Sequence, residues 1–153
     1  MIYLAMLLAF LADRATKWWA ADYLSGHGPT RINAWLTFRA TYNRGISFGL
    51  FQGIGPVVGW LTLLFLLGLL VYLVRLPKQA WLLRLGLAIL IGGAMGNLVD
   101  RIFVGQVLDF VETPLRQGIF NVADVMIHLG TILAFMGVLR QEKMATAVSD
   151  DSV

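Results

Sequence analysis

The sequence is dominated by four long, mainly apolar stretches that are separated by more polar segments. A helix that crosses a bilayer core of roughly 30 Å needs about 20 mostly apolar residues. Four stretches meet this need and predict helices at about 2–23, 55–76, 81–100 and 122–140. The sequence therefore predicts a membrane α-helical protein, a four-transmembrane-helix bundle formed by one domain over residues 1–142.

The first apolar stretch is interpreted as a retained helix rather than a cleaved signal peptide. No basic residue precedes its apolar run, and no clear small-residue cleavage site follows it. The last residues, 143–153, are polar and small, which predicts a disordered cytoplasmic tail.

Two connecting segments, about 31–51 and 102–111, have the character of strands rather than plain loops. Both are rich in β-branched and aromatic residues and are bounded by turn-forming residues. They predict a small β element lying on the outer membrane surface. Aromatic residues suited to an interfacial belt lie in or near these segments, namely Trp18, Trp19, Trp35, Tyr42 and Phe51.

Composition narrows the class of protein further. Hydrophobic residues make up 58% of the chain and charged residues only 14%, against roughly 45–50% and about 25% in ordinary soluble domains. These values argue against a soluble globule, a disordered chain and a nucleic-acid binder. The chain has no cysteine and two histidines, so we expect no disulfide, no catalytic thiol, no metal site and no cofactor.

Basic residues indicate how the helices are oriented. Arg75, Lys78 and Arg84 lie in or beside the connection between the second and third helices, and Arg140 and Lys143 follow the fourth. Since Lys and Arg concentrate on the cytoplasmic side, both termini are predicted to be cytoplasmic. The first outer segment also contains three arginines, which weakens this contrast.

Charged residues inside apolar helices need a partner or a function, because each costs roughly 2.5–3.5 kcal/mol at the bilayer centre on insertion scales. Asp13 and Lys17 are four residues apart and share a helix face. They form either a self-compensating ion pair or a pair that supports a polar site. Gly92 and Gly96 form a small-xxx-small face for close helix packing.

The end of the third helix carries an amide, a carboxylate and a guanidinium in close succession, at Asn97, Asp100 and Arg101. Asn97 and Arg101 share a face, and Arg101 could orient a carboxylate or a peptide carbonyl. A plain helix cap is the alternative. Asn43 and Gly45 lie in a turn that needs no function to explain it.

Asp109 and Asp124 are the most informative pair. Asp109 interrupts an apolar strand-like run, and Asp124 lies in the first turn of the fourth helix. A solvated loop carboxylate and a carboxylate favoured by the helix dipole are the alternatives. If the turn between them brings them together, they share a proton and become an acid and a base able to hydrolyse a peptide bond. His128 is interpreted as a packing residue.

With these residues identified, the sequence resembles the bacterial lipoprotein signal peptidase family, also called signal peptidase II or prolipoprotein signal peptidase. Five segments match the family's motifs in order, namely Asp13-Arg14-Ala15-Thr16-Lys17, Tyr42-Asn43-Arg44-Gly45-Ile46-Ser47-Phe48, Gly92 to Arg101, Val107-Leu108-Asp109-Phe110 and Phe120-Asn121-Val122-Ala123-Asp124. The match departs from the family's common pattern at Ile46-Ser47, where small residues are usual.

The resemblance implies an aspartic endopeptidase of the bacterial inner membrane, with its site near the periplasmic face. It also implies a four-transmembrane-helix bundle with a small periplasmic β element, a cradle. Its substrate would be a prolipoprotein that is cleaved just before a diacylglyceryl-modified Cys, and globomycin-type inhibitors would block it. Asp109 and Asp124 take the place of the catalytic pair. The resemblance implies site-shaping roles for Asn43, Gly45, Asn97, Asp100, Arg101, Asn121 and Ala123, and supporting roles for Asp13, Lys17, Gly92 and Gly96. Membrane lipids are expected neighbours, and a monomer is expected.

Two other functions remain open from the residues alone. A small proton or solute transporter would use buried acids as a relay, with polar residues spread across the bilayer. A structural membrane subunit would pack through Gly92 and Gly96 and would tolerate neutralisation of the Asp residues.

Overall fold

Four long helices and a small three-stranded sheet make up the computed structural model, which describes residues 1–45, 55–115 and 118–150. The helices are α1 (Ile2–His27), α2 (Gly55–Arg75), α3 (Trp81–Phe103) and α4 (Val122–Asp150). The strands are β1 (Thr30–Arg31), β2 (Thr37–Asn43) and β3 (Val107–Glu112). The prediction of a helical protein with a small β element is confirmed. Ser47, Phe48 and Phe51 lie outside the described residues.

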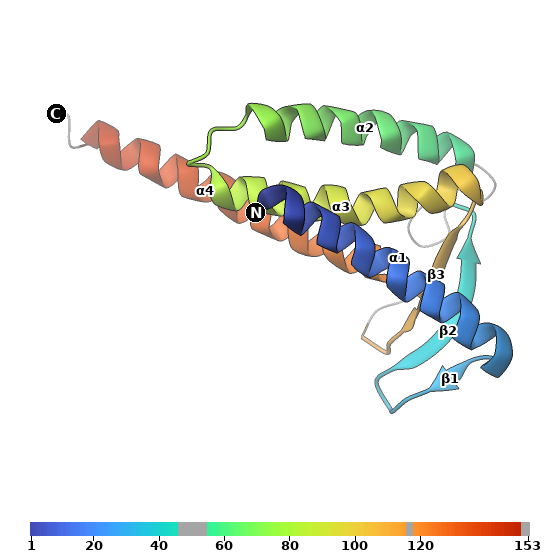
Figure 1. Ribbon diagram of the computed structural model, residues 1–153. Coiled ribbons are helices and arrows are strands. Elements are labelled where there is room, and N and C mark those ends of the chain that lie inside the picture. The colour runs from blue at the N-terminus through green and yellow to red at the C-terminus, as the bar shows by residue number, and fades with distance from the viewer. Residues whose placement is uncertain (46–54, 116–117, 151–153) are drawn as a thin grey trace.

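Helix α3 forms the centre of the bundle and packs against α1, α2 and α4 (Figure 1). Two of its faces consist of small residues. Gly86 and Gly93 lie against the backbone of α4, and a Cβ at either position would overlap it. Gly92 lies in the same way against the backbone of α1. These glycines let three helix backbones approach closely. Gly92 belongs to the small-xxx-small face that the sequence predicts, whereas the contacts of Gly86 and Gly93 with α4 were not predicted.

The outer faces of the helices are strongly apolar. Helix α2 exposes large side chains such as Trp60, Leu64 and Phe65 along its length. A water-soluble monomer rarely exposes so large an apolar surface. Within the described residues, three helical segments are long and apolar enough to cross a bilayer, namely Val57–Arg75, Trp81–Phe103 and Val122–Lys143. Helix α1 is of similar length but carries Asp13, Arg14 and Lys17 in its middle.

The sheet lies at one end of the helices, with the strands in the order β1-β2-β3 and both pairings antiparallel (Figure 1). Its apolar face packs on the last turns of α1, where Ala20 and Leu24 meet Leu108 and Phe110. Trp19 packs edge-on against Phe38, with ring centroids 5.1 Å apart. Trp19 therefore joins the sheet to α1 as well as being a candidate belt residue.

Two glycines with left-handed backbone mark the ends of the helices that lead into the sheet. Gly28, with φ of 67°, follows α1, and its N–H donates to the carbonyl of Leu24. Gly105, with φ of 76°, follows α3, and its N–H donates to the carbonyl of Asp100. Glycine adopts this conformation without steric cost, so both chain reversals are encoded locally.

The helices begin at the residues that the apolar pattern predicts, but α1 and α4 are longer than predicted. Helix α1 continues to His27 instead of ending near residue 23. Helix α4 runs to Asp150, through most of the segment predicted to be a disordered tail. Residues such as Glu142, Lys143, Met144 and Ala145 have good helix propensity, so nothing in this sequence stops the helix. Residues 151–153 lie outside the described residues.

Candidate active site

Asp109 lies on β3, buried to 5% exposure between the sheet and the start of α4. One carboxylate oxygen accepts a hydrogen bond of 2.6 Å from Asn121 Nδ2, and the other accepts one of 3.3 Å from Asn43 Nδ2. Burial raises the pKa of Asp109 from 3.8 to about 6, and the negative charge of Asp124 adds to this increase. The hydrogen bonds from Asn43 and Asn121 act in the opposite direction but are weaker.

Asp124 is held by the N-terminus of α4. The side-chain oxygen of Asn121 accepts from the N–H of Asp124 at 3.0 Å, and Asp124 Oδ2 accepts from the N–H of Asn121 at 3.3 Å. This reciprocal arrangement is a capping box, with Asn121 as N-cap and Asp124 as the third helical residue. The other oxygen of Asp124 accepts from Asn97 Nδ2 at 3.1 Å. The carboxylate of Asp124 is therefore fixed at the positive end of a helix dipole.

Asn121 connects the two carboxylates directly. Its Nδ2 donates to Asp109, and its backbone N–H donates to Asp124. The same Nδ2 also lies within hydrogen-bond reach of Asn97 Oδ1, at 3.0 Å, and of the Leu108 carbonyl, at 3.4 Å. Asn121 is completely buried. The structure thus brings Asp109 and Asp124 together on opposite sides of one amide side chain.

A second group of charges supports this pair from α1. Lys17 Nζ lies 3.0 Å from Asp13 and 2.8 Å from Asp100, and it donates to Asn97 Oδ1 at 2.7 Å. Asp13 in turn accepts from the N–H of Ala123, the second residue of α4, at 2.9 Å. Both Asp13 and Lys17 are buried. The predicted pair Asp13 and Lys17 exists, and it connects α1 to both α3 and α4.

Gly96 allows this approach between α1 and α3. A Cβ at Gly96 would overlap the Asp13 carboxylate. Gly96 therefore makes room for a side chain, the Asp13 carboxylate, whereas Gly92 makes room for the backbone of α1.

Arg101 lies close to Gly45, the last described residue before position 46. Arg101 Nη2 lies 3.5 Å from the carbonyl oxygen of Gly45, and the N–H of Gly45 donates to Asn43 Oδ1 at 3.0 Å. The charge of Arg101 interacts with those of Asp100, Asp109 and Asp124. Arg101 Nε is buried and has no hydrogen-bond partner within the described residues.

Two residues join the network without having been predicted as site residues. Arg14 forms an ion pair with Asp100, and the Leu108 carbonyl lies near Asn121 Nδ2. Arg14 could have been found from its charge in the middle of an apolar helix. A backbone carbonyl has no sequence signal. His128 Nδ1 contacts the backbone carbonyl of Asp124 at 2.6 Å, so it does not reach the Asp124 carboxylate through this nitrogen.

In the described part of the chain, no group of three or more His, Cys, Asp or Glu side chains has an arrangement that could hold a metal ion. The chemical groups that the site does bring together are two carboxylates, three amides and the cations around them. Two carboxylates in different surroundings can act as an acid and a base toward a bound water.

Comparison with known protein families decides the identity of this arrangement. The family model described as signal peptidase (SPase) II, Peptidase_A8, matches residues 5–140. The chain belongs to the signal peptidase II family. The resemblance inferred from the five motifs is confirmed, and so is the prediction of an aspartic-type peptidase.

Curated relatives support the same family over nearly the whole chain. The lipoprotein signal peptidase of Clostridium novyi is 34% identical, over 92% of this chain and 98% of its own length. That of Anoxybacillus flavithermus is 34% identical, over 97% and 90%. That of Teredinibacter turnerae is 35% identical, over 94% and 89%.

Solved structures agree with the fold. Two structures described as bacterial membrane enzymes match with TM-scores of 0.80, at 22% and 24% identity. They cover 92% and 90% of this chain, and 88% and 92% of their own chains. The architecture of this signal peptidase II family member is thus that of a known membrane-enzyme fold.

Proposed function

We propose that this chain is an aspartic endopeptidase of the bacterial inner membrane that cleaves prolipoproteins just before a diacylglyceryl-modified Cys. Membership in the signal peptidase II family makes it a peptidase that removes signal peptides from prolipoproteins. The observation that carries the proposed mechanism is that Asn121 bridges two carboxylates held in different surroundings.

Asp124 acts as the base in this mechanism. Its carboxylate accepts hydrogen bonds from Asn97 and from the backbone of Asn121 at the start of α4. These donors and the positive end of the α4 dipole hold the Asp124 carboxylate in a fixed position. Asp124 therefore takes a proton from a water that lies between the two acids, and the water oxygen attacks the scissile carbonyl carbon.

Asp109 acts as the acid. Burial and the charge of Asp124 raise its pKa to about 6, so it carries the proton of the pair more readily than an exposed carboxyl would. It donates this proton to the carbonyl oxygen as the tetrahedral intermediate forms. Asp124 then protonates the leaving amide nitrogen, the C–N bond breaks, and a proton of the intermediate returns to Asp109.

The surrounding residues have positioning roles in this proposal. Asn43, Asn97 and Asn121 orient the two carboxylates. Asp100 holds Lys17 and Arg14 in place, and the Lys17 ammonium in turn holds Asn97. The Asp13 carboxylate holds Lys17 and the N–H of Ala123 in place, and Gly92 and Gly96 allow α1 to approach α3 closely.

Arg101 and Gly45 are proposed to contact the substrate. A guanidinium offers five donors and no acceptor, and the Nε of Arg101 lacks a partner among the described residues. A peptide carbonyl of the substrate supplies the missing acceptor. Globomycin-type inhibitors would compete for the same position.

In the proposed membrane arrangement, all four helices span the bilayer as one domain of residues 1–142, both termini are cytoplasmic, and the protein acts as a monomer. Two charges in the middle of α1, those of Asp13 and Lys17, argue for this arrangement because they face protein rather than lipid. Asp13 is fully buried and Lys17 is 2% exposed. The two carboxylates then lie near the periplasmic face, where both water and a lipid-anchored substrate are within reach.

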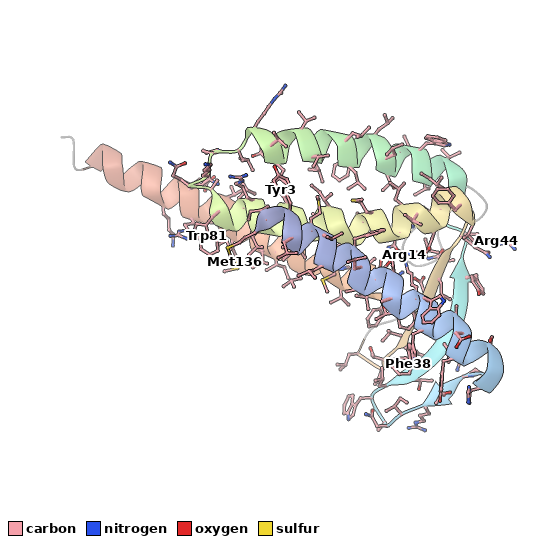
Figure 2. The ribbon with its side chains drawn as sticks, in the orientation of Figure 1. Tyr3, Arg14, Phe38, Arg44, Trp81 and Met136 are labelled. Atoms are coloured by element: carbon pink, nitrogen blue, oxygen red, sulfur yellow. The ribbon has the colours of Figure 1, made fainter. Side chains whose placement is uncertain are left out.

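The location of the polar residues favours a peptidase over a proton or solute relay. Among the described residues, the buried polar and charged side chains are Asp13, Lys17, Asn97, Asp100, Asp109 and Asn121. All six belong to one network at the sheet end of the bundle. A relay would need further polar residues toward the opposite end, where Figure 2 labels Trp81 and Met136.

Neutralising each acid tests the proposal. We expect Asp109→Asn and Asp124→Asn each to reduce cleavage of a diacylglyceryl-modified prolipoprotein by at least about 100-fold, the lower range for acid–base groups. Asp22→Asn removes an exposed carboxylate of α1 and serves as the matched control. Thermal melting in detergent establishes that each variant is folded. Full activity of either folded site variant would exclude the two-carboxylate mechanism and would favour a structural role.

A further inference from the structure

The sheet carries a groove away from the two carboxylates. It has a volume of about 290 Å³ and is lined by residues that include Arg31, Trp35, Thr37, Arg39, Glu112 and Pro114. Asp109 lies three residues before Glu112 on β3, so the groove is at the opposite end of that strand from the site. Nothing in the proposed peptidase mechanism uses these residues.

We propose that this groove binds the headgroup phosphate of an anionic phospholipid, with the sheet resting on the surface of the bilayer. The partner is a phospholipid of net charge −1, such as phosphatidylglycerol. This inference goes beyond the peptidase function and does not depend on it. It requires only that this end of the helices lies at a membrane surface.

The charges of the groove fit one phosphate diester. Arg31 uses Nε to donate to the Asn33 carbonyl at 3.2 Å, and Arg39 uses Nε to pair with Glu112 at 3.0 Å. The terminal nitrogens of both guanidinium groups have no hydrogen bond within the described chain. Guanidinium groups bind phosphate oxygens in pairs of parallel hydrogen bonds.

The net charge also selects the kind of lipid. Two arginines and one glutamate give the lining a formal charge of +1. An anionic headgroup, which has a phosphate and no positively charged group, neutralises this charge. A zwitterionic headgroup brings a second cation toward the arginines and gains less.

Exposed apolar side chains lie in the groove lining or next to lining residues in the sequence, as expected for a lipid-facing surface. Trp35 is 62% exposed, Ile32 on the same loop is 54% exposed, and Leu115 beyond β3 is 84% exposed. Tryptophan beside arginine is typical of a membrane–water interface, where the ring lies at headgroup depth. Exposing three large apolar side chains to water beside a charged groove is unfavourable, so contact with lipid explains their exposure better than contact with water does.

The position of the sheet places the groove next to lipid. Figure 1 shows β1 and β2 extending away from α2, α3 and α4 on the side of α1, so this part of the sheet does not cover the helix bundle. If the helices cross a bilayer, the area beside the bundle under β1 and β2 is occupied by lipid. The groove therefore faces headgroups rather than another part of the chain.

Soluble short-chain lipids test the proposal without an activity measurement. The purified full chain in neutral detergent is titrated with dihexanoylphosphatidylglycerol, and bound lipid is counted by native mass spectrometry. We expect binding at least tenfold tighter than that of dihexanoylphosphatidylcholine. Arg31→Gln combined with Arg39→Gln removes this preference, whereas Glu112→Gln strengthens binding because it removes the repelling carboxylate.

Arg44→Gln is the matched control, because Arg44 is an exposed arginine at the far end of β2, paired with Gln106 (Figure 2). It should leave lipid binding unchanged. Equal binding by the double variant and by the Arg44 variant would overturn the proposal. Inorganic phosphate that competes at the same concentration would show a free-anion site instead. An acidic peptide that binds where phosphatidylglycerol does not would show a polypeptide groove instead.

A second measurement tests whether the sheet rests on the bilayer. In nanodiscs that contain brominated phospholipid, Trp35 fluorescence should be quenched, so Trp35→Phe should lose a quenched component that Trp60→Phe on α2 retains. An unquenched Trp35 would place the groove away from the lipid and would refute the proposal, whether or not the chain is an active peptidase.

Discussion

The buried Asp109 carboxyl should reduce the stability of the folded protein at neutral pH, because burial raises its pKa. This carboxyl is 5% exposed, and its pKa is raised from 3.8 to about 6. A difference of this size corresponds to about 3 kcal/mol between the two protonation states. Between these two pH values the folded protein holds a proton that the unfolded chain has already released. The cost therefore grows as the pH rises through this range and is fully present above about pH 6.

Replacing Asp109 with Asn removes the charge and keeps the shape. The variant loses one hydrogen bond, because an amide has a single oxygen to accept from Asn121 and Asn43, at a cost of about 1 kcal/mol. The net effect at pH 7 is a stabilisation of about 2 kcal/mol. For a chain of this size, that is a rise in melting temperature of about 4–8 °C.

The measurement is the melting temperature of the purified protein in detergent, followed by intrinsic fluorescence from pH 4 to pH 8. The Asp109→Asn variant should melt above the parent protein at pH 7, and the gap should close or reverse toward pH 4. Asp22→Asn, on the exposed face of α1, should follow the parent protein throughout. Parallel profiles for Asp109→Asn and the parent protein would refute the assignment of the raised pKa to this carboxyl.

Three further substitutions test the supporting network. Asn121→Ala removes a hydrogen bond to a charged group worth about 1.5–3 kcal/mol, so kcat/KM for prolipoprotein cleavage should fall about 10- to 150-fold. Gly96→Ala forces a methyl group against the α1 carboxylate and should cost about 1–3 kcal/mol in thermal stability, whereas Gly68→Ala, which has open space, should cost nothing. Lys17→Met leaves two buried carboxylates without their shared cation and should cost about 3–5 kcal/mol, whereas Lys78→Met in the exposed loop should not change the melting temperature.

The positions of the helices could be predicted because apolar length is a local property of the sequence. Nearly uninterrupted apolar residues define α2, and α3 is apolar apart from Arg84 until it reaches Asn97. The end of α4 could not be predicted in this way, because residues 144–150 no longer form a long apolar run but still form helix. A change from apolar to polar residues indicates where a helix leaves an apolar environment. Where the helix ends depends instead on the helix propensity of the residues that follow.

The meeting of Asp109 and Asp124 was predictable in outline, because a short turn connects β3 to α4. The bridge between Val111 and Phe120 closes this turn. The residue that joins the two acids could not be assigned its contacts from spacing alone. Asn121 caps α4 with its backbone and side-chain oxygen while its Nδ2 donates to Asp109, and these directions depend on where β3 lies.

Contacts between helices could not be predicted from the sequence pattern. Arg14 and Asp100 are 86 residues apart and meet because α1 and α3 pack at one particular rotation. The spacing of Asp13 and Lys17 gave their shared face but not the second carboxylate on the far side of the ammonium. The helical period of the sequence shows which residues share a helix face, whereas the packing of the helices decides which residues that face contacts.

The charges of the network explain why a single proton matters to the site. The cluster contains four carboxylates and three cations, namely Asp13, Asp100, Asp109, Asp124, Arg14, Lys17 and Arg101. With every group ionised its formal charge is −1, which is costly in a buried setting. One bound proton makes the cluster neutral, and the raised pKa of Asp109, about 6, lets this carboxyl take up a proton at a higher pH than an exposed carboxyl would. The ion pairs on α1 therefore do more than neutralise α1, because they set the charge of the cluster to a value that one proton balances.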